Sequence, residues 1–449
     1  MTAWRVGVAI RPETVFGDGG AGNWRYIGVG MDFNFTEQNN WKFQNGMGSK
    51  VPELEFEGRF SGTWNGNLYL DYNNFYWIQF ALEGYAYGTA TYPTDSEESG
   101  REVGIHIFTT ANNKALKSFA LRFIKLDRPV GGYDANLKAD EEIILKGCVM
   151  NKFSPSYEGS STSAVKCSIG GVFVDTQLTC KEETDTIDGM TGKNNVRAIN
   201  WGCLKVMNED NSGWEKIANN ERTGFTFSRS TSTIPDCGQR IDTAFYESAI
   251  QPITITSLVY SRNPNQWQTR MHTGGARNDL NLTTNTTSSP KEKGLEPIPN
   301  IRIESGTPND SGRTADYLCI AEFEDCVVDS WGNSYNSQSE ITENPTLKAM
   351  KGQIMFATPD VKTSMVAGVA GTDYNTIVKV TYDFDNGDTA DLVAFYPKDT
   401  IIKLLDYKGT KTDNDFKGWS VSGGSVLAPG TSQKITADTT FTASWQSTA

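Results

Sequence analysis

The chain has 449 residues, with 41 Lys and Arg against 54 Asp and Glu, which gives a formal net charge of −13 at pH 7. That length exceeds one ordinary hydrophobic core, so two or three domains are expected. No basic run is present to neutralise phosphates, which excludes a protein that grips a nucleic-acid duplex. The 43 glycines and 11% aromatic residues, without a long helix-forming window, predict a mainly β protein rich in turns.

The N-terminal sequence gives no sign of a secretory or membrane protein. Residues 1–20 lack a basic start followed by an apolar stretch, and no run approaches 18 apolar residues, so neither a signal peptide nor a membrane anchor is expected. None of the seven cysteines forms a C-x-x-C pair, and two histidines cannot complete a zinc finger. Several cysteines lie in apolar alternating runs, which favours reduced, structural cysteines in a protein made in the cytoplasm. The cysteines are Cys148, Cys167, Cys180, Cys203, Cys237, Cys319 and Cys326.

Short alternating runs fill residues 4–70 and predict strands. Asn-Gly pairs at 45–46 and 65–66 predict hairpin turns between them. One helix is expected over 71–84, capped by Asp71 or Asn73 and ended by Gly84. Two further strand patterns follow it in the sequence.

A similar unit occurs twice, at residues 139–174 and 315–357. Each copy begins with Ala-Asp and continues with an alternating strand, a Cys-Val-hydrophobic triplet, a Ser-Tyr pair and a second strand. Both the cysteine and the tyrosine of the second copy follow those of the first by 178 residues. The pattern favours a duplicated domain. We interpret the segments Cys148–Asn151 and Cys326–Asp329 as fold-bearing strands.

These patterns divide the chain into three parts. The expected domains are 1–180, then 181–365 with a long polar loop at 275–313, and a compact unit at 376–449 after a Gly- and Ala-rich linker. The stretch 180–245 fits none of the strand patterns.

The sequence offers little that indicates catalysis. His106 alternates with Ile105 and Ile107, which predicts a solvent-facing strand position, and His272 has no evident partner. The segment 383–388, DFDNGD, has Gly at the fifth position of a calcium loop, so Asn386-Gly387 reads more simply as a type I′ turn.

Paired carboxylates could in principle serve a glycosidase, but they are more simply solvated strand and turn positions. The pairs are Glu53/Glu55 and Glu141/Glu142. No catalytic, cofactor-binding or metal-binding residue is therefore assigned, and an enzyme is not expected.

Residues 376–449 resemble the B-repeat of bacterial surface proteins, a small Ig-like or β-grasp module. The match rests on the phrase FKGWS at 416–420, on Pro429-Gly430, on TADTTF at 436–441, and on an apolar set. That set comprises Val380, Tyr382, Phe416, Trp419, Phe441 and Trp445. Such modules serve as spacers, adhesins and decorations, so the resemblance implies a fold and leaves the function open.

The first part of the chain resembles the tail tube (major tail) proteins of long-tailed phages and archaeal viruses. The opening phrase carries Arg11, Glu13, Thr14 and Gly17 at the positions of that family's (K/R)xETxxG phrase. The segment from 118 to 171 is similar to the family's core hairpin. The likeness covers most of residues 1–180 and, more loosely, 245–360.

The resemblance implies a mainly β chain: a duplicated tail-tube β-sandwich or barrel with a flanking helix, plus a small C-terminal β domain. It also implies stacked rings, either hexamers or trimers that act as pseudo-hexamers, with tape measure and tail terminator proteins as partners. DNA would pass through an acidic-lined conduit during ejection without specific binding. The polar loop would reach the next ring, and the last domain would decorate a flexible, non-contractile virion tail.

Two other functional classes stay open from the sequence. The C-terminal module alone suggests a cell-surface adhesin or S-layer-type protein, which would be expected to carry a signal peptide and an anchor. A carbohydrate-active β-sandwich enzyme would need a cleft with paired carboxylates.

Overall fold

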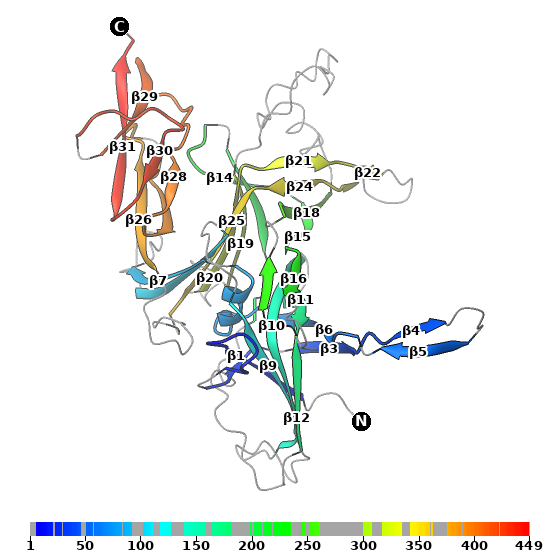
Figure 1. The fold of residues 1–449 in the computed structure, drawn as a ribbon. Helices are drawn as coiled ribbons and strands as arrows, with labels where there is room; N and C mark the ends of the chain where they lie inside the picture. The colour runs from blue at the N-terminus through cyan, green and yellow to red at the C-terminus, as the bar shows by residue number, and fades with distance from the viewer. Residues whose placement is uncertain are drawn as a thin grey trace, which may run out of the picture.

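The computed structural model describes most of the chain, and its fold is mainly β (Figure 1). The mainly β class predicted from the sequence is confirmed, and the structure forms several sheets. The described residues are 6–20, 23–28, 30–45, 51–56, 58–82, 84–91, 102–110, 117–126, 139–158, 164–180, 198–199, 202–208, 210–217, 219–234, 242, 244–247, 251–260, 300–307, 317–334, 342–359, 361, 375–387, 389–421 and 423–448.

The first part of the chain supplies twelve strands and one short helix. They are β1 (Val6–Pro12), β2 (Arg25–Tyr26), β3 (Gly30–Gln38), β4 (Lys42–Asn45), β5 (Pro52–Phe56), β6 (Ser61–Tyr69), η1 (Tyr76–Phe80), β7 (Gly84–Thr91), β8 (Glu102–Thr109), β9 (Phe119–Leu126), β10 (Ala139–Glu158), β11 (Lys166–Phe173) and β12 (Asp175–Cys180).

The second part supplies strands β13 to β25. They are β13 (Cys203–Met207), β14 (Trp214–Lys216), β15 (Asn220–Ser228), β16 (Thr231–Ile234), β17 (Ala244–Glu247), β18 (Ile253–Tyr260), β19 (Ile301–Thr307), β20 (Tyr317–Glu324), β21 (Val327–Ser330), β22 (Asn333–Ser334), β23 (Thr342–Glu343), β24 (Thr346–Ala349) and β25 (Lys351–Thr358). The last domain contains β26 (Asn375–Asp383), β27 (Leu392–Pro397), β28 (Ile401–Lys403), β29 (Asn414–Val421), β30 (Ser432–Lys434) and β31 (Thr439–Ser447).

The helix expected over 71–84 is wrong in length and type. Only Tyr76–Phe80 is helical, as the 3₁₀-helix η1, and all five of its side chains are buried. Because all five side chains, Gln79 included, are buried, the segment has no exposed face for an amphipathic α-helix and fits inside the core as a short turn of helix. Gly84 begins strand β7.

Two sequence signals for turns are strands in the structure. Asn65 and Gly66 lie inside β6, where the ring of Phe33 on β3 occupies the space that a side chain at residue 66 would fill. The polar segment 275–313 contains strand β19, in which Ile301 and Ile303 are fully buried. In these segments, the alternation of buried and exposed side chains determined the secondary structure more strongly than the nearby turn residues did. The rest of the polar loop lies outside the described residues, apart from Asn300.

Two large sheets enclose the main core. In the 14-stranded sheet, hydrogen bonding runs through β3, β6, β11, β10, β15, β18, β24 and β21. The 11-stranded sheet runs from β14 through β13, β19, β20, β25, β8 and β7 into the last domain. One cluster of buried apolar side chains draws on both sheets and on both parts of the chain.

The boundary expected at residue 180 does not separate two sheets. Strand β10 pairs with β15 of the second part, and β8 pairs with β25. The two parts therefore share hydrogen-bonded sheets as well as a core.

Two sets of strands have matching registers. The pairings β1–β9, β9–β10, β10–β12, β10–β11, β11–β6 and β6–β3 in the first part correspond to β13–β19, β19–β20, β20–β25, β21–β24, β24–β18 and β18–β15 in the second. Hairpin β4–β5 and hairpin β16–β17 occupy the same place between their flanking strands.

The irregularities of the two sets also coincide. The β10–β11 pair has a β-bulge between Met150 and Lys152, and the β21–β24 pair has one between Val328 and Ser330. A bulge tends to be kept as a feature of a fold because it sets the bend and twist of its strand.

A second shared bulge lies in the neighbouring strand pair. It falls between Gly30 and Asp32 in β3–β6, and between Asn220 and Arg222 in β15–β18.

Both cysteines that the sequence analysis singled out follow a kink with a left-handed residue. Gly147 precedes Cys148 with φ of 61°, and Asp325 precedes Cys326 with φ of 53°. Each thiol is fully buried and donates to the carbonyl three residues earlier, at 3.5 Å for Cys148 and 3.6 Å for Cys326. In β10, residues 141–146 pair with β12 and residues 149–156 pair with β11, so the kink lies where the strand changes partners.

The last domain has its own aromatic core, which brings the predicted apolar set together. Val380, Tyr382, Trp419 and Phe441 are buried, and the ring centroids of Tyr382 and Trp419 are 4.8 Å apart. Strand β26 pairs in parallel with β7 at its first residues, so the domain continues the 11-stranded sheet.

The turn expected at Asn386-Gly387 differs from type I′. Asp385 and Gly387 have positive φ, whereas Asn386 does not, and the Asn386 side chain donates to Thr389 at 2.9 Å. A longer loop, held by side-chain hydrogen bonds, thus connects β26 to β27.

The kink at residue 147 predicts a clear difference between two substitutions. Gly147→Ala places a methyl group against Val174 and Phe16 at a left-handed φ, so it should lower the free energy of unfolding by about 1–3 kcal/mol. Asp325→Gly removes a side chain from the matching position and only loses an exposed ion pair with Lys403, so its effect should stay within about 1 kcal/mol. Urea denaturation measures both; equal destabilisation would contradict the account of the kink.

Candidate assembly surfaces

The sheet that contains β3, β6, β11, β10, β15, β18, β24 and β21 has one apolar and one polar face. Burial alternates along β6, β11 and β18, and the buried positions contribute Trp64, Ile169 and Ile255 to the core. The opposite face, which we call the polar face, carries hydroxyl and amide side chains with a few charges. Its members include Asp32, Asn34, Thr36, Gln38, Ser61, Thr63, Asn65, Asn67, Lys152, Ser154, Ser156, Glu158, Lys166, Ser168, Arg222, Thr226, Ser228, Thr254, Thr256, Thr346 and Lys348.

Neighbouring strands are linked by side-chain hydrogen bonds across the polar face. Asn67 donates to Asp32 at 2.8 Å and accepts from Ser168, so three strands are joined. Ser154 and Thr226 lie 2.8 Å apart, which links β10 to β15 across the junction of the two parts. These pairs satisfy one another and fix the side chains along the face.

The polar face carries few charges of either sign. Four of the named members are cationic, one on each of four strands, and two are acidic. The net negative charge of the chain therefore lies elsewhere, and this surface is mostly neutral.

The two ends of this sheet are open edges in the described part of the chain. Strand β3 pairs only with β6, and β21 pairs only with β24. Phe33 and Phe35 on β3 are half-buried, whereas their counterparts on β15, Thr223 and Phe225, are buried. The difference follows from the pairing, because β15 has strand β10 along its second edge.

The segment at residues 11–17 packs over the kink of β10. The Glu13 carboxylate is buried and accepts hydrogen bonds from the backbone N–H of Gly147 at 2.8 Å, of Gly19 at 3.1 Å and of Gly17 at 3.1 Å. Arg11 donates to the Gly19 carbonyl. These residues hold the loop 13–19 onto the strand and have a structural role.

His106 is buried, which corrects the prediction of a solvent-facing position. Its ring lies 2.8 Å from the Tyr85 hydroxyl and 3.0 Å from the Val361 carbonyl, and burial lowers the pKa of His106 to about 4. The ring packs against Phe75 as part of the core, because β8 is covered on both faces. His272 lies outside the described residues.

The two described members of the carboxylate pairs differ in their exposure. Glu142 is buried and pairs with Arg122 at 2.6 Å, so the solvated position expected for it is wrong, while Glu55 is exposed on β5. The side chains of Glu53 and Glu141 lie outside the described part. Within the described residues, no group of three or more His, Cys, Asp or Glu could hold a metal ion.

Five cysteines have described thiols, and all five are free. Four are buried and Cys203 is half-buried, as expected for structural cysteines. Burial raises the pKa of Cys326 to about 12, so this thiol stays protonated at neutral pH. No helix among the described residues is long and apolar enough to span a bilayer.

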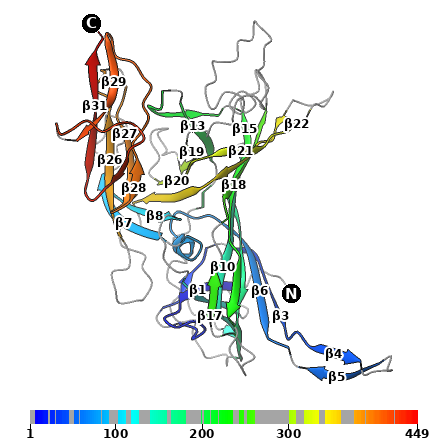
Figure 2. The same cartoon turned by 45° about the horizontal axis from the view of Figure 1, so that its top comes forward.

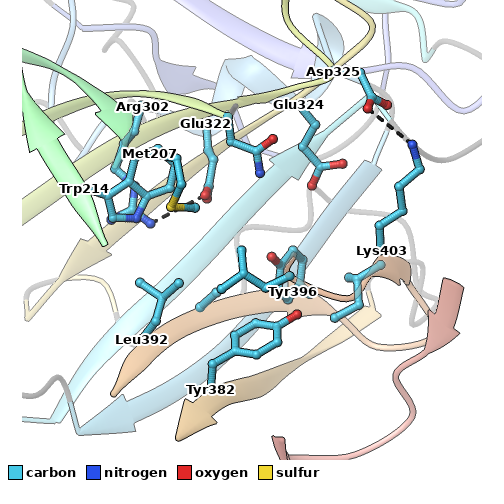
Figure 3. Close-up of a pocket in the computed structure, with 14 residues that line it drawn as sticks. Met207, Trp214, Arg302, Glu322, Glu324, Asp325, Tyr382, Leu392, Tyr396 and Lys403 are labelled. Atoms are coloured by element: carbon cyan, nitrogen blue, oxygen red, sulfur yellow. Dashed lines mark hydrogen bonds and ion pairs between the residues drawn. The ribbon is translucent and has the colours of Figure 1, made fainter. Parts of the chain in front are cut away.

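A pocket lies between the last domain and the 11-stranded sheet (Figure 3). Arg302 stacks over Trp214 at 4.2 Å and lies 3.5 Å from Glu322, while Lys403 reaches across to Asp325 at 3.3 Å. Figure 3 shows the Glu324 carboxylate directed into the space between the two layers. Burial, together with Glu322, raises the pKa of Glu324 above its ordinary value.

The first part of the chain contains an Arg–Trp pair that corresponds to Arg302 and Trp214. Arg122 on β9 lies over Trp24 at 5.5 Å, in the corresponding place. In the second part the last domain covers this site.

No protein-family model matches the chain, and no curated protein matches it in sequence. The geometry of the sheet edges therefore carries the functional argument.

The pocket gives a prediction about pH. Burial and the neighbouring Glu322 raise the pKa of Glu324, so the folded state is favoured at low pH and loses stability as pH rises through the raised pKa. Glu324→Gln should therefore raise the melting temperature at neutral pH and bring no gain below the ordinary carboxyl range. Thermal unfolding of this variant and of Asp415→Asn, an exposed control, measures the effect. An equal gain at both pH values would contradict the assignment.

Proposed function

We propose that the chain is a structural virion protein whose copies join edge to edge into rings that stack as a tail tube. The observation that supports this proposal most directly is the pairing of β10 with β15 inside one chain. The counterparts of these strands, β21–β22 and β3, lie at opposite ends of the same sheet as open edges in the described residues. If the two parts are copies of one fold, β21–β22 of one chain pairs with β3 of the next.

The internal pairing gives the register of the proposed contact. Lys152 pairs with Ser228, and Ser156 pairs with Gly224. The matching positions are Ser330 opposite Gln38, and Ser334 opposite Asn34, between neighbouring chains.

Such a contact is heterologous, since it joins two different edges, and it forms a closed ring when the rotation per copy closes. Each chain supplies two equivalent units, so three chains give a pseudo-hexamer. Closure would also remove both open edges, which are otherwise sites of unwanted strand pairing.

The polar face would line the conduit of this ring. Its hydroxyl and amide groups hydrogen-bond with one another, and its four cations are spread over four strands, so no cationic cluster is available to bind phosphates. We therefore propose a mostly neutral lining along which DNA moves without specific binding.

The last domain would decorate the outside of the tube. It extends the 11-stranded sheet through β26 and lies away from β3 and β6 (Figures 1 and 2). Tape measure and tail terminator proteins are the partners that fit such a tube, which would assemble in the host cytoplasm and remain in the virion tail.

The proposed register can be tested with engineered cysteines. Ser330→Cys combined with Gln38→Cys places two thiols on directly paired positions, within the Cα separation that a disulfide spans. Mild oxidation should yield covalently linked oligomers, ending at a closed trimer, on non-reducing gels.

The matched control is Ser330→Cys with Thr36→Cys, which shifts one thiol by two residues and should link much less. If both pairs and the unmodified chain remain monomeric under oxidation, the ring contact is wrong, and the surface adhesin becomes the better hypothesis for this chain.

A further inference from the structure

Hairpin β4–β5 extends the β3–β6 pair away from the body of the molecule (Figure 2). Trp41 immediately precedes strand β4, and Phe43 lies within it. Trp41 is 44% exposed and Phe43 is 62% exposed. Two large aromatic side chains in this position mark a contact surface that one chain leaves uncovered.

The counterpart hairpin, β16–β17, is seated on the first part of the chain. The Asn151 side chain donates to Thr231 at 3.4 Å, and the Asn151 carbonyl accepts from the Arg229 backbone at 3.0 Å. The ring of Phe245 lies 5.3 Å from that of Phe16. The contacts of β16–β17 within one chain thus serve as a template for the contacts of β4–β5.

Two apolar positions beside the kink are buried in the first part and exposed in the second. Val149 and Val174 in the first part are buried, whereas their counterparts Val327 and Met350 are 39% and 69% exposed. Asp329, the counterpart of Asn151, is also exposed. Of the ten large apolar side chains exposed in the described residues, three lie on or beside hairpin β4–β5 and two are Val327 and Met350.

We infer that hairpin β4–β5 of one copy docks on the second part of the neighbouring copy, with Trp41 beside Asp329 and with Trp41 and Phe43 covering Val327 and Met350. Trp41 lies three residues after the end of β3, and Thr231 lies three residues after the end of β15, so the Trp41 indole N–H would lie near the Asp329 carboxylate. The contact lies next to the strand pairing and adds apolar burial to it. This inference rests on the proposed ring.

Photo-crosslinking tests the contact directly. p-Benzoylphenylalanine replaces Phe43, and in a separate protein it replaces Val426, an exposed position on the last domain. Mixing isotopically heavy and light chains before irradiation separates links between copies from links within one copy.

The expected result is a heavy-to-light link from position 43 to peptides that contain Val327–Ser330 or Met350, with none of these links from position 426. Rings that form while position 43 links elsewhere, or only within its own chain, would overturn this inference and leave the ring in place. Absence of rings for the unmodified chain at high concentration would overturn the proposed function itself.

A second variant pair measures the strength of the contact. Trp41→Ser with Phe43→Ser should raise the concentration at which rings form by about tenfold or more, because buried aromatic contacts dominate interface energies. Val426→Ser should leave that concentration unchanged. Sedimentation velocity provides the readout, and equal thresholds for the two variants would contradict the docking.

Discussion

The structure depends on the antiparallel pairing of the second half of β10 with β15. This ladder joins the two parts of the chain into one sheet, and it places their apolar faces over a common core. It is reinforced on the other face by the contact between Ser154 and Thr226. Without it, each part would end in an open strand with its hydrogen-bonding groups in water.

The same pairing explains why two similar sets of strands have different burial. β15 is buried because β10 lies along it, while β3 has only β6 among the described strands. Likewise Val149 and Val174 are buried, and Val327 and Met350 are exposed. The β3 difference falls where a second strand partner is missing among the described residues. Val174 lies beside Gly17, in a loop that is shorter in the second part.

The sequence predicted the mainly β class because alternation and turn residues are local signals. It also picked out Cys148 and Cys326, whose kinks and thiol contacts match in the structure. It failed where tertiary contacts decide the outcome: the apolar segment at η1 became a short 3₁₀-helix, and His106 became a core residue bonded to Tyr85. The polar face could not be read from net charge, since charge carries no information about which side of a strand faces the core.

Pairings between distant strands could likewise not be predicted from the sequence. Residues 180–245 fitted no pattern, yet they provide β13 and β15, the counterparts of β1 and β3. The loop between β13 and β14 is shorter than the loop that carries Glu13, so the two sets of strands differ at their first connection.

The central claim is that copies of this chain close into a ring through the edges β3 and β21–β22. The most direct measurement is electron microscopy of the purified protein at high concentration, with its mass in solution recorded alongside. The account predicts end views with a central hole, threefold symmetry and the mass of three chains or of stacked trimers. A persistent monomer, or a ring in which three-dimensional reconstruction leaves both edges unpaired, would contradict it.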